Sequence, residues 1–264
     1  MTVRRALAAA TGLVAGAVAV VALAQSGSGA PPGRDELVAP NLPNPPRLGL
    51  QIPDPVPLAP AGTESRWAPV LRAVSVRARP RGNAPAVARL DTRTPEGTAN
   101  LVVTLGRTRD AEGRVWVRSR LPVLPNGTTG WVPRTALGGY TVVSTRLVVD
   151  LARITALLLR DGRPVFRAPI GVGTSDAPTP TGDFYVRVRV DRFDDPFYGP
   201  LAFGTSARSA VLTDWPAGGF IGIHGTNRPE LIPGSVSHGC IRMRNDDILT
   251  LGRLMEVGTP VTIR

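Results

Sequence analysis

The side chains best suited to chemistry lie close together near the end of the chain. Both histidines, His224 and His238, and the only cysteine, Cys240, fall within 17 residues. An imidazole beside a thiol favours the reactive thiolate, accepts its proton and can return that proton to a leaving amine. Gly239 allows close backbone approach, so that N–H groups around Cys240 can donate to the negative charge developing on an attacked carbonyl. The cluster therefore indicates nucleophilic catalysis by Cys240.

Two other interpretations fit the same cluster. As metal ligands, the three residues would supply one fewer than the four that structural zinc takes. No Asp or Glu adjoins either histidine, and the nearest, Glu230, lies in an expected loop. As buried core residues they would have no chemical role, since cysteine is among the residues most often buried. We expect neither a metal nor another cofactor in this protein.

Two short strings surround these residues: residues 224–227 read His-Gly-Thr-Asn, and residues 237–243 read Ser-His-Gly-Cys-Ile-Arg-Met. Together they closely resemble the L,D-transpeptidase catalytic domain. Residues 147–150 and 178–184 also match that family, so the resemblance covers residues 141–264. The order of histidine before cysteine argues against papain-like and other exported cysteine peptidases, in which the cysteine comes first.

The resemblance implies a mainly antiparallel β-sandwich that acts on peptidoglycan stem peptides. Cys240 would attack the carbonyl of the third residue of a stem tetrapeptide, release the terminal D-Ala and form a thioester. An amine of a neighbouring stem would then resolve this acyl-enzyme into a 3→3 cross-link. His224 would act as general base and acid, oriented by a backbone carbonyl such as that of Gly225. Carbapenem-type inhibitors would acylate the same thiol.

Two alternatives to a transpeptidase are a hydrolase and a non-catalytic protein. With water as the acceptor, the same site would be an L,D-carboxypeptidase that yields a free tripeptide. Without catalysis, the protein would bind the cell wall through its N-terminal region.

The other residues of the cysteine string receive supporting roles from the resemblance. His238 and Gly239 would lie on the oxyanion side, together with the backbone amide of Cys240. Ser237 would hold the turn that presents the thiol.

Three further residues, Arg242, Asn227 and Tyr198, are candidates for substrate binding. A guanidinium at Arg242 suits bidentate pairing with a substrate carboxylate, and the alternative is an ion pair with an aspartate at 246–247. Asn227 would hold its own loop or touch the substrate. Tyr198 and Trp215 would line a substrate groove or pack against the core.

Residues 141–264, the catalytic region, must position these side chains mainly with β-strands. Residues 146–150, 156–160 and 183–190 are apolar or alternate with period two. The dipeptide Asp161-Gly162 predicts a hairpin turn. No alternation of strands and helices is present, which argues against a doubly wound parallel sheet.

One helix is expected near the end of the chain. Asn245 is a good N-cap, and the acidic residues 246–247 suit the first turn of a helix. Gly258 is expected to end the helix, with Pro260 after it. The helix would bury one apolar face, formed by Ile248, Leu249, Leu251, Leu254 and Met255.

Residues 66–140 also predict short strands. Residues 74–79 and 115–118 alternate with period two, and turn signals include residues 95–97 and 125–127. Tryptophans and glycines around residues 116–132 resemble those of bacterial SH3-like domains on exported wall enzymes. The fold class is therefore all-β, with a small SH3-like barrel that would bind or space, followed by the catalytic sandwich.

The first 65 residues predict export and a spacer. Residues 1–24 carry two arginines and then 19 uncharged residues, which indicates a signal peptide or a membrane anchor. Residues 25–65 form a Pro-rich linker, with ten prolines between residues 31 and 60. Whether residues 1–24 are a signal peptide or an anchor, they would place the rest of the chain in the periplasm or cell wall. A lone cysteine is unusual in an exported protein.

The charge of the chain is consistent with an anionic wall as partner. All 31 basic residues are arginines against 20 acidic ones, giving a net charge of +11. These arginines are spread along the chain, and export separates them from nucleic acid, so no nucleic-acid partner is expected. A single cysteine also excludes a disulfide scaffold.

Overall fold

The computed structural model describes residues 54–58, 64–191, 195–212 and 219–264. The predicted signal or anchor segment, most of the predicted linker and Trp215 lie outside these residues. Within the described residues, no helix has the length and apolarity to cross a membrane.

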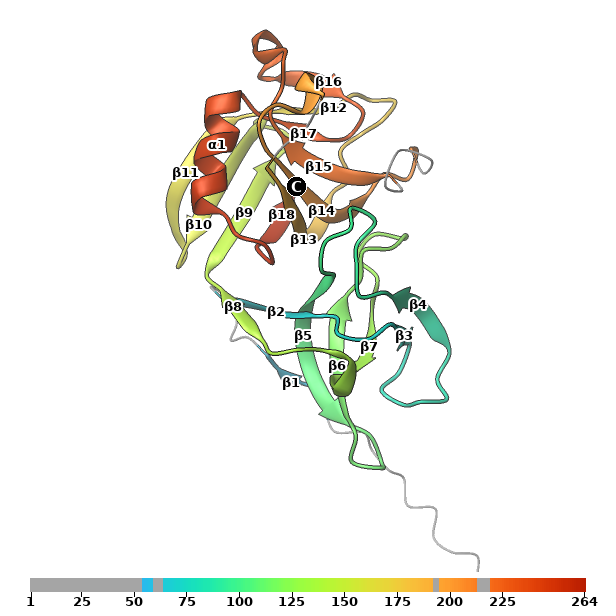
Figure 1. The fold of residues 1–264 in the computed structure, drawn as a ribbon. Coiled ribbons are helices and arrows are strands. Elements are labelled where there is room, and N and C mark those ends of the chain that lie inside the picture. The colour runs from blue at the N-terminus through green and yellow to red at the C-terminus, as the bar shows by residue number, and fades with distance from the viewer. Residues whose placement is uncertain (1–53, 59–63, 192–194, 213–218) are drawn as a thin grey trace, which may run out of the picture. The chain divides into compact units, whose positions relative to one another are not determined.

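The first part of the described chain forms an eight-stranded antiparallel sheet, called here the N-terminal sheet (Figure 1). Its strand order is β4-β3-β7-β6-β5-β2-β8, with β1 paired to β5. The strands are β1 (Val56–Pro57), β2 (Ser65–Pro69), β3 (Val74–Arg77), β4 (Ala86–Leu90), β5 (Leu101–Arg109), β6 (Val115–Arg120), β7 (Thr129–Pro133) and β8 (Thr141–Val143), with the 3-10 turn η1 (Arg134–Ala136) before β8. The two predicted alternating segments correspond to β3 and β6. An SH3-like identity for this sheet and the domain boundaries stay predictions.

Strand β1 lies inside the segment predicted as a Pro-rich linker. Val56 pairs with Arg107 and Pro57 with Gly106, so β1 adds an edge to β5. Proline is tolerated at such an edge because it needs no backbone N–H for a further strand. The end of the predicted linker is thus bound to the sheet.

The catalytic region forms a ten-stranded sheet in the order β11-β10-β9-β18-β13-β14-β15-β17-β12-β16. Its strands are β9 (Thr145–Asp150), β10 (Thr155–Arg160), β11 (Arg163–Pro169), β12 (Gly171–Gly173), β13 (Gly182–Val190), β14 (Ala202–Arg208), β15 (Phe220–His224), β16 (Gly234–Ser237), β17 (Ile241–Arg242) and β18 (Pro260–Ile263); the 3-10 turns are η2 (Pro196–Tyr198) and η3 (Pro229–Leu231), and the helix is α1 (Asn245–Leu254). The expected all-β class with one short helix is confirmed. Most strand pairs are antiparallel, but β9–β18, β12–β16 and β15–β17 are parallel.

The long strand β13 joins the two halves of this sheet into a sandwich. Its first four residues, up to Tyr185, pair with β18, and from Val186 onward it pairs with β14. A strand that changes partner along its length makes a corner between two packed layers. One core fills the space between the layers and includes residues of both halves and of the helix, among them Leu147, Phe203, Ile223, Leu251 and Val261.

The predicted hairpin turn between β10 and β11 is confirmed. Arg160 pairs directly with Arg163, which leaves Asp161 and Gly162 as a two-residue loop. Both have positive φ, 50° and 77°. Two central residues with positive φ are the mark of a type I′ turn, which suits the twist of the flanking strands.

The helix occurs where the sequence predicts it, but its capping differs. Helix α1 begins at Asn245, its N-cap is Arg244, and no side chain caps it. The N-cap prediction for Asn245 is therefore wrong, because its side chain accepts a hydrogen bond from Thr226 N–H instead. Ile248 and Leu251 are buried as expected, whereas Leu249 is exposed and Met255 lies just past the helix end. In Figure 1 the helix crosses the β9–β11 part of the sheet.

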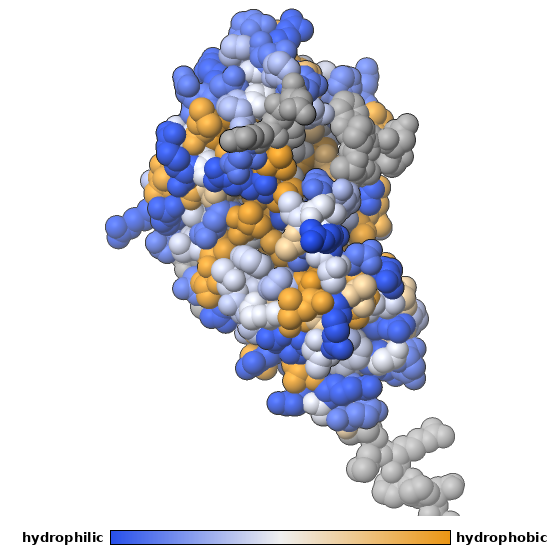
Figure 2. Space-filling model, viewed as in Figure 1, coloured by the Kyte–Doolittle hydropathy of each residue, from blue (hydrophilic) through white to orange (hydrophobic). Residues whose placement is uncertain are grey.

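Polarity is mixed over the face of the protein seen in Figure 2. Hydrophilic residues in blue and hydrophobic residues in orange are interspersed there over short distances.

Gly258, in the turn before β18, is the position where we expect an added methyl group to be most disruptive to the fold. Its φ is +88°, and a Cβ there would overlap the ring of Trp67. Gly258→Ala combines backbone strain with overpacking, so the unfolding free energy of the variant is expected to fall by roughly 2–5 kcal/mol.

Gly113 is the matched control, since its φ is +77° and a Cβ there would meet open space. Gly113→Ala is expected to cost about 1–2 kcal/mol. Denaturant unfolding measures both, and equal losses would refute the overlap.

Candidate active site

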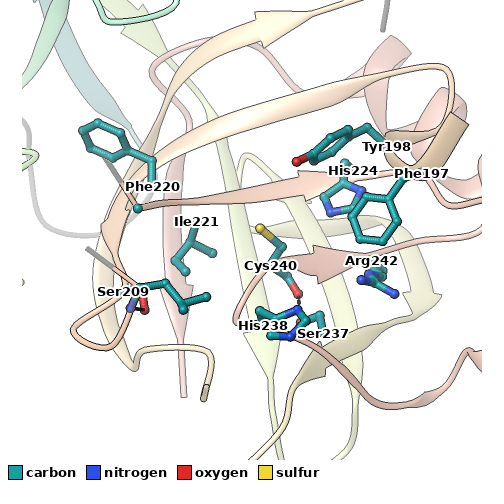
Figure 3. Close-up of a pocket in the computed structure, with 12 residues that line it drawn as sticks. Phe197, Tyr198, Ser209, Phe220, Ile221, His224, Ser237, His238, Cys240 and Arg242 are labelled. Atoms are coloured by element: carbon teal, nitrogen blue, oxygen red, sulfur yellow. Dashed lines mark hydrogen bonds between the residues drawn. The ribbon is translucent and has the colours of Figure 1, made fainter. Parts of the chain in front are cut away.

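Cys240 and His224 face one pocket of the catalytic region (Figure 3). Phe220, Ile221 and Ser209 lie on one side of the thiol, and His224 with its neighbours lies on the other. The pocket is lined by Phe197, Tyr198, Ser209, Leu212, Gly219, Phe220, Ile221, His224, Ser237, His238, Cys240 and Arg242.

Cys240 is presented by the short connection between β16 and β17. The Ser237 hydroxyl donates to Cys240 O at 2.6 Å and accepts from Gly239 N–H at 3.1 Å. Gly239 has a φ of +110°, which an L side chain rarely adopts. Ser237 thus closes the turn, while the Gly239 N–H, being bound to Ser237, is directed away from any oxyanion role.

Thr179 secures the same turn from a distant segment. Its hydroxyl donates to Gly239 O at 2.9 Å and accepts from Gly173 N–H at 2.9 Å. Thr179 is buried, so both ends of this bridge are shielded from water. The match of residues 178–184 to the family had indicated this segment but not its role.

The thiol of Cys240 is partly enclosed and receives one backbone hydrogen bond. Gly222 N–H donates to Sγ at 3.3 Å. Burial raises the pKa of Cys240, while the Gly222 hydrogen bond and the positive charge of Arg242 oppose that rise. The resting thiol is therefore protonated at neutral pH and needs a base.

His224, at the end of β15, has the properties of that base. Its side chain is 1% exposed, and its Nδ1 lies 2.6 Å from Gly225 O. A carbonyl oxygen only accepts, so neutral His224 carries its proton on Nδ1 and has a free lone pair on Nε2. Nε2 has no hydrogen-bond partner within the described residues. Burial, aided by the charge of Arg242, lowers the pKa of His224 to about 4 against the opposing bond to Gly225.

Two aromatic rings of η2 lie beside this imidazole. The ring centroids of Tyr198 and Phe197 are 5.0 Å and 6.0 Å from that of His224. The turn is capped by the Asp195 carboxylate, which accepts from Phe197 N–H at 2.9 Å. Tyr198 was expected here, whereas Phe197 was not, because nothing in its sequence context distinguishes it from a core aromatic.

Arg242 is a buried cation at the edge of the pocket. Its residue is 7% exposed, its guanidinium lies 4.4 Å from the Phe197 ring centroid, and its Nε has no partner in the described residues. The ion pairs of the described residues do not include it, so the alternative pairing with residues 246–247 is not found. Such a guanidinium is suited to a carboxylate from a ligand.

Two other candidates lie at or beyond the rim. His238 lines the pocket but is exposed to solvent. Asn227 is exposed in the loop after β15 and does not line the pocket. Within the described residues, no group of three or more His, Cys, Asp or Glu side chains is arranged to hold a metal ion.

Asn245 is a site residue that sequence reasoning misassigned. Its Oδ1 accepts from Thr226 N–H at 2.9 Å, and a Cβ on Gly199 or Gly225 would lie 2.5 Å from that oxygen. Asn245 therefore fixes the peptides that follow His224, including the carbonyl that selects its tautomer. Only the close packing of helix start and loop shows this role.

We expect Asn245→Ala to weaken catalysis more than stability. Loss of one hydrogen bond costs about 1 kcal/mol. Without this bond the Gly225 peptide is no longer held in place, and the His224 imidazole that it orients is misaligned. Such misplacement is expected to lower the rate of Cys240 acylation roughly tenfold to a hundredfold. Acylation by a carbapenem, followed by intact mass, measures the rate. The control Asp246→Ala changes the same helix end without touching the loop after His224; an equal effect of both variants would contradict the role of Asn245.

Comparison with known proteins places this site in a family. Residues 144–263 match the model of the L,D-transpeptidase catalytic domain named YkuD. YkuD of Bacillus subtilis (strain 168) is 38% identical over 124 residues, which are 47% of this chain and 68% of that protein. YkuD of Bacillus licheniformis is 39% identical over 118 residues, 45% of this chain and 64% of that protein. The chain thus spans about two thirds of the length of each of these relatives.

A solved structure is also similar. The NMR structure of the catalytic domain of the E. faecium L,D-transpeptidase is 27% identical, covers 46% of this chain and 96% of that one, and has a TM-score of 0.34. His224 and Cys240 both fall within residues 144–263, which match the family model. The chain belongs, through residues 144–263, to the YkuD family of L,D-transpeptidase catalytic domains.

Proposed function

We propose that this protein is an exported peptidoglycan L,D-transpeptidase with Cys240 as nucleophile and His224 as general base. One observation carries the proposal: a neutral imidazole with its Nε2 lone pair free shares a pocket with the enclosed thiol. Family membership supplies the substrate class, the stem peptides of peptidoglycan.

In the acylation half-reaction, His224 Nε2 takes the thiol proton as Cys240 Sγ attacks the third-residue carbonyl of the donor tetrapeptide. The bond from sulfur to carbon forms, and the bond to D-Ala breaks once the imidazolium returns its proton to the leaving amine. The amide of Cys240 is the expected donor to the developing oxyanion. The product is a thioester and free D-Ala.

In the transfer half-reaction, the side-chain amine of a neighbouring stem attacks the thioester. His224 accepts a proton from that amine and gives one to the departing thiolate, so that a new amide forms and Cys240 is restored. The low pKa of His224 suits this exchange, because the imidazole is neutral at the start of each half-reaction.

Arg242 is our candidate for recognising a substrate carboxylate, and Tyr198 for lining the groove beside the base. Arg242 is at the pocket, charged and without an ion pair to another described residue, so a carboxylate of the stem or of a carbapenem would neutralise it. Carbapenems would acylate Cys240 in the same way as the donor. His238, at the exposed rim, would border the entering chain.

The remaining parts of the chain would bring this site to its substrate. Residues 1–24 would export the protein, as a cleaved signal or as an anchor, into the periplasm or cell wall. A net charge of +11 would favour contact with an anionic wall. The part of residues 25–65 that precedes β1 would provide reach, as proline-rich segments extend by about 3.1 Å per residue.

The test is the mass spectrum of products from the purified protein and a disaccharide-tetrapeptide. A cross-linked dimer that has lost one D-Ala is expected. A free tripeptide as the main product would instead make the protein an L,D-carboxypeptidase. No product and no adduct on Cys240 would leave only a wall-binding role and would overturn the proposal.

A further inference from the structure

Two side chains from the N-terminal sheet, Asn126 and Glu96, bind arginines that adjoin one wall of the catalytic pocket. Asn126 lies in the turn between β6 and β7, and Glu96 in the turn between β4 and β5. Both turns were apparent from the sequence, but neither lies in residues 144–263, which match the family. The catalytic function described above leaves both residues without a role.

Asn126 pairs with the main chain of Arg208, the last residue of β14. Its Oδ1 accepts from Arg208 N–H at 3.0 Å, and its Nδ2 donates to Arg208 O at 2.8 Å. One amide side chain thus satisfies both backbone groups of a strand residue, as a neighbouring strand would. The next residue, Ser209, lines the pocket and donates its N–H to Gly219 O at 2.9 Å.

Glu96 acts on the same wall through a buried arginine. Arg187, only 2% exposed, donates from Nη2 to Glu96 Oε1 at 2.7 Å and from Nε to Thr205 O at 3.1 Å. Its guanidinium carbon lies 3.6 Å from the ring centroid of Phe220, and that of Arg208 lies 4.9 Å from it. A buried guanidinium is costly without a partner charge, so Glu96 stabilises the cation on which Phe220 rests.

Phe220 connects these contacts to the reacting thiol. It is the first residue of β15 and lines the pocket on the side opposite His224 (Figure 3). Two residues further along the same strand, Gly222 donates its N–H to Cys240 Sγ. A shift of Phe220 therefore changes the shape of the pocket wall that a bound donor must contact.

We propose that Asn126 and Glu96 are positioning residues that hold Ser209 and Phe220, two residues of one pocket wall, in place for the donor stem. The N-terminal sheet would then support the catalytic pocket directly, in addition to any role as a spacer or in binding the cell wall. The identity of the donor in this inference rests on the proposed function, whereas the contacts of Asn126 and Glu96 do not depend on it.

The wall and the thiol are held by different contacts, which makes the proposal testable. The turn of Cys240 is fixed by Ser237 and Thr179, and the imidazole of His224 by Gly225. None of these contacts involves Asn126 or Glu96. Loosening the wall should therefore impair a large donor that touches it, and spare a small reagent that needs only the thiol.

The experiment compares two rates for the full chain and for the variants Asn126→Ala and Glu96→Gln. Acylation by a disaccharide-tetrapeptide is expected to slow roughly tenfold to a hundredfold, as misplaced substrate contacts commonly do. Alkylation of Cys240 by iodoacetamide is expected to be unchanged. Hydrogen exchange at residues 208–209 and 220–221 is expected to accelerate in both variants, while that of Gly222, which donates to Cys240 Sγ, is expected to stay unchanged. This readout is independent of activity.

Matched controls come from other turns of the same sheet. Asn83 is an exposed asparagine between β3 and β4, and Glu112 also pairs with an arginine, Arg114. Asn83→Ala and Glu112→Gln should leave acylation and the hydrogen exchange of residues 208–209 and 220–221 at wild-type values.

Two results would overturn the inference. One is unchanged acylation and exchange in Asn126→Ala and Glu96→Gln; the other is an equal loss of acylation and alkylation, which would mean general damage. If Asn126→Ala fails to fold, Glu96→Gln decides alone. A wild-type protein that does not react with the donor overturns the proposed function, and the exchange data then decide the positioning role separately.

Discussion

Replacing Cys240 with alanine is expected to eliminate the covalent adduct with a tetrapeptide donor or a carbapenem, and with it the release of D-Ala. No other cysteine is present in the chain, so no second thiol can take over. Removing the nucleophile of a site whose members act as a unit typically costs at least about 10³-fold in rate. Intact mass detects the adduct, and liberated D-Ala measures turnover.

The same variant should fold normally, which separates loss of chemistry from loss of structure. The thiol receives one hydrogen bond, from Gly222 N–H, while the turn is closed through the backbone of Cys240. Cys240→Ser is the companion variant: it keeps an acceptor for Gly222 but replaces the thiol by a much less acidic hydroxyl. D-Ala release at the wild-type rate in either variant would exclude Cys240 as the nucleophile.

That Cys240 and His224 share one pocket was predictable, because the signal for it is local. Cys240 and His224 stand out by residue type and spacing, and the turn residues Ser237 and Gly239 adjoin the thiol in sequence. The hairpin at Asp161 is equally local, since two residues with positive φ close it. Local chemistry of this kind can be read without knowing which strands pair.

The remainder of the site depends on packing between distant segments. Thr179 reaches Gly239 across 60 residues of sequence, and Asn245 reaches back 19 residues to Thr226. No propensity or motif distinguishes an asparagine that caps its own helix from one that binds another loop. The change of partner along β13 and the three parallel strand pairs are non-local in the same sense.

His224→Gln is expected to slow acylation by Cys240 roughly 10²–10⁴-fold, the usual contribution of a general base. In the wild type, the pKa of His224 is lowered to about 4, mainly by burial. The neutral base therefore persists as pH falls, and the acylation rate should decline only near pH 4 rather than between pH 6 and 7. A decline centred near pH 6.5 would show that the imidazole titrates as if exposed, which contradicts this environment.

The same lowered pKa makes the fold less stable in acid, and the sign follows from proton binding. Between about pH 6.5 and pH 4 the unfolded chain protonates this histidine while the folded protein keeps it neutral. Unfolding is then favoured increasingly as pH falls, by at most about 3 kcal/mol for a shift of this size. Glutamine does not titrate, so His224→Gln should lose less stability than the wild type between pH 7 and pH 4. Urea unfolding at both pH values measures the difference, and parallel losses in the two proteins would mean that another group carries the acid sensitivity.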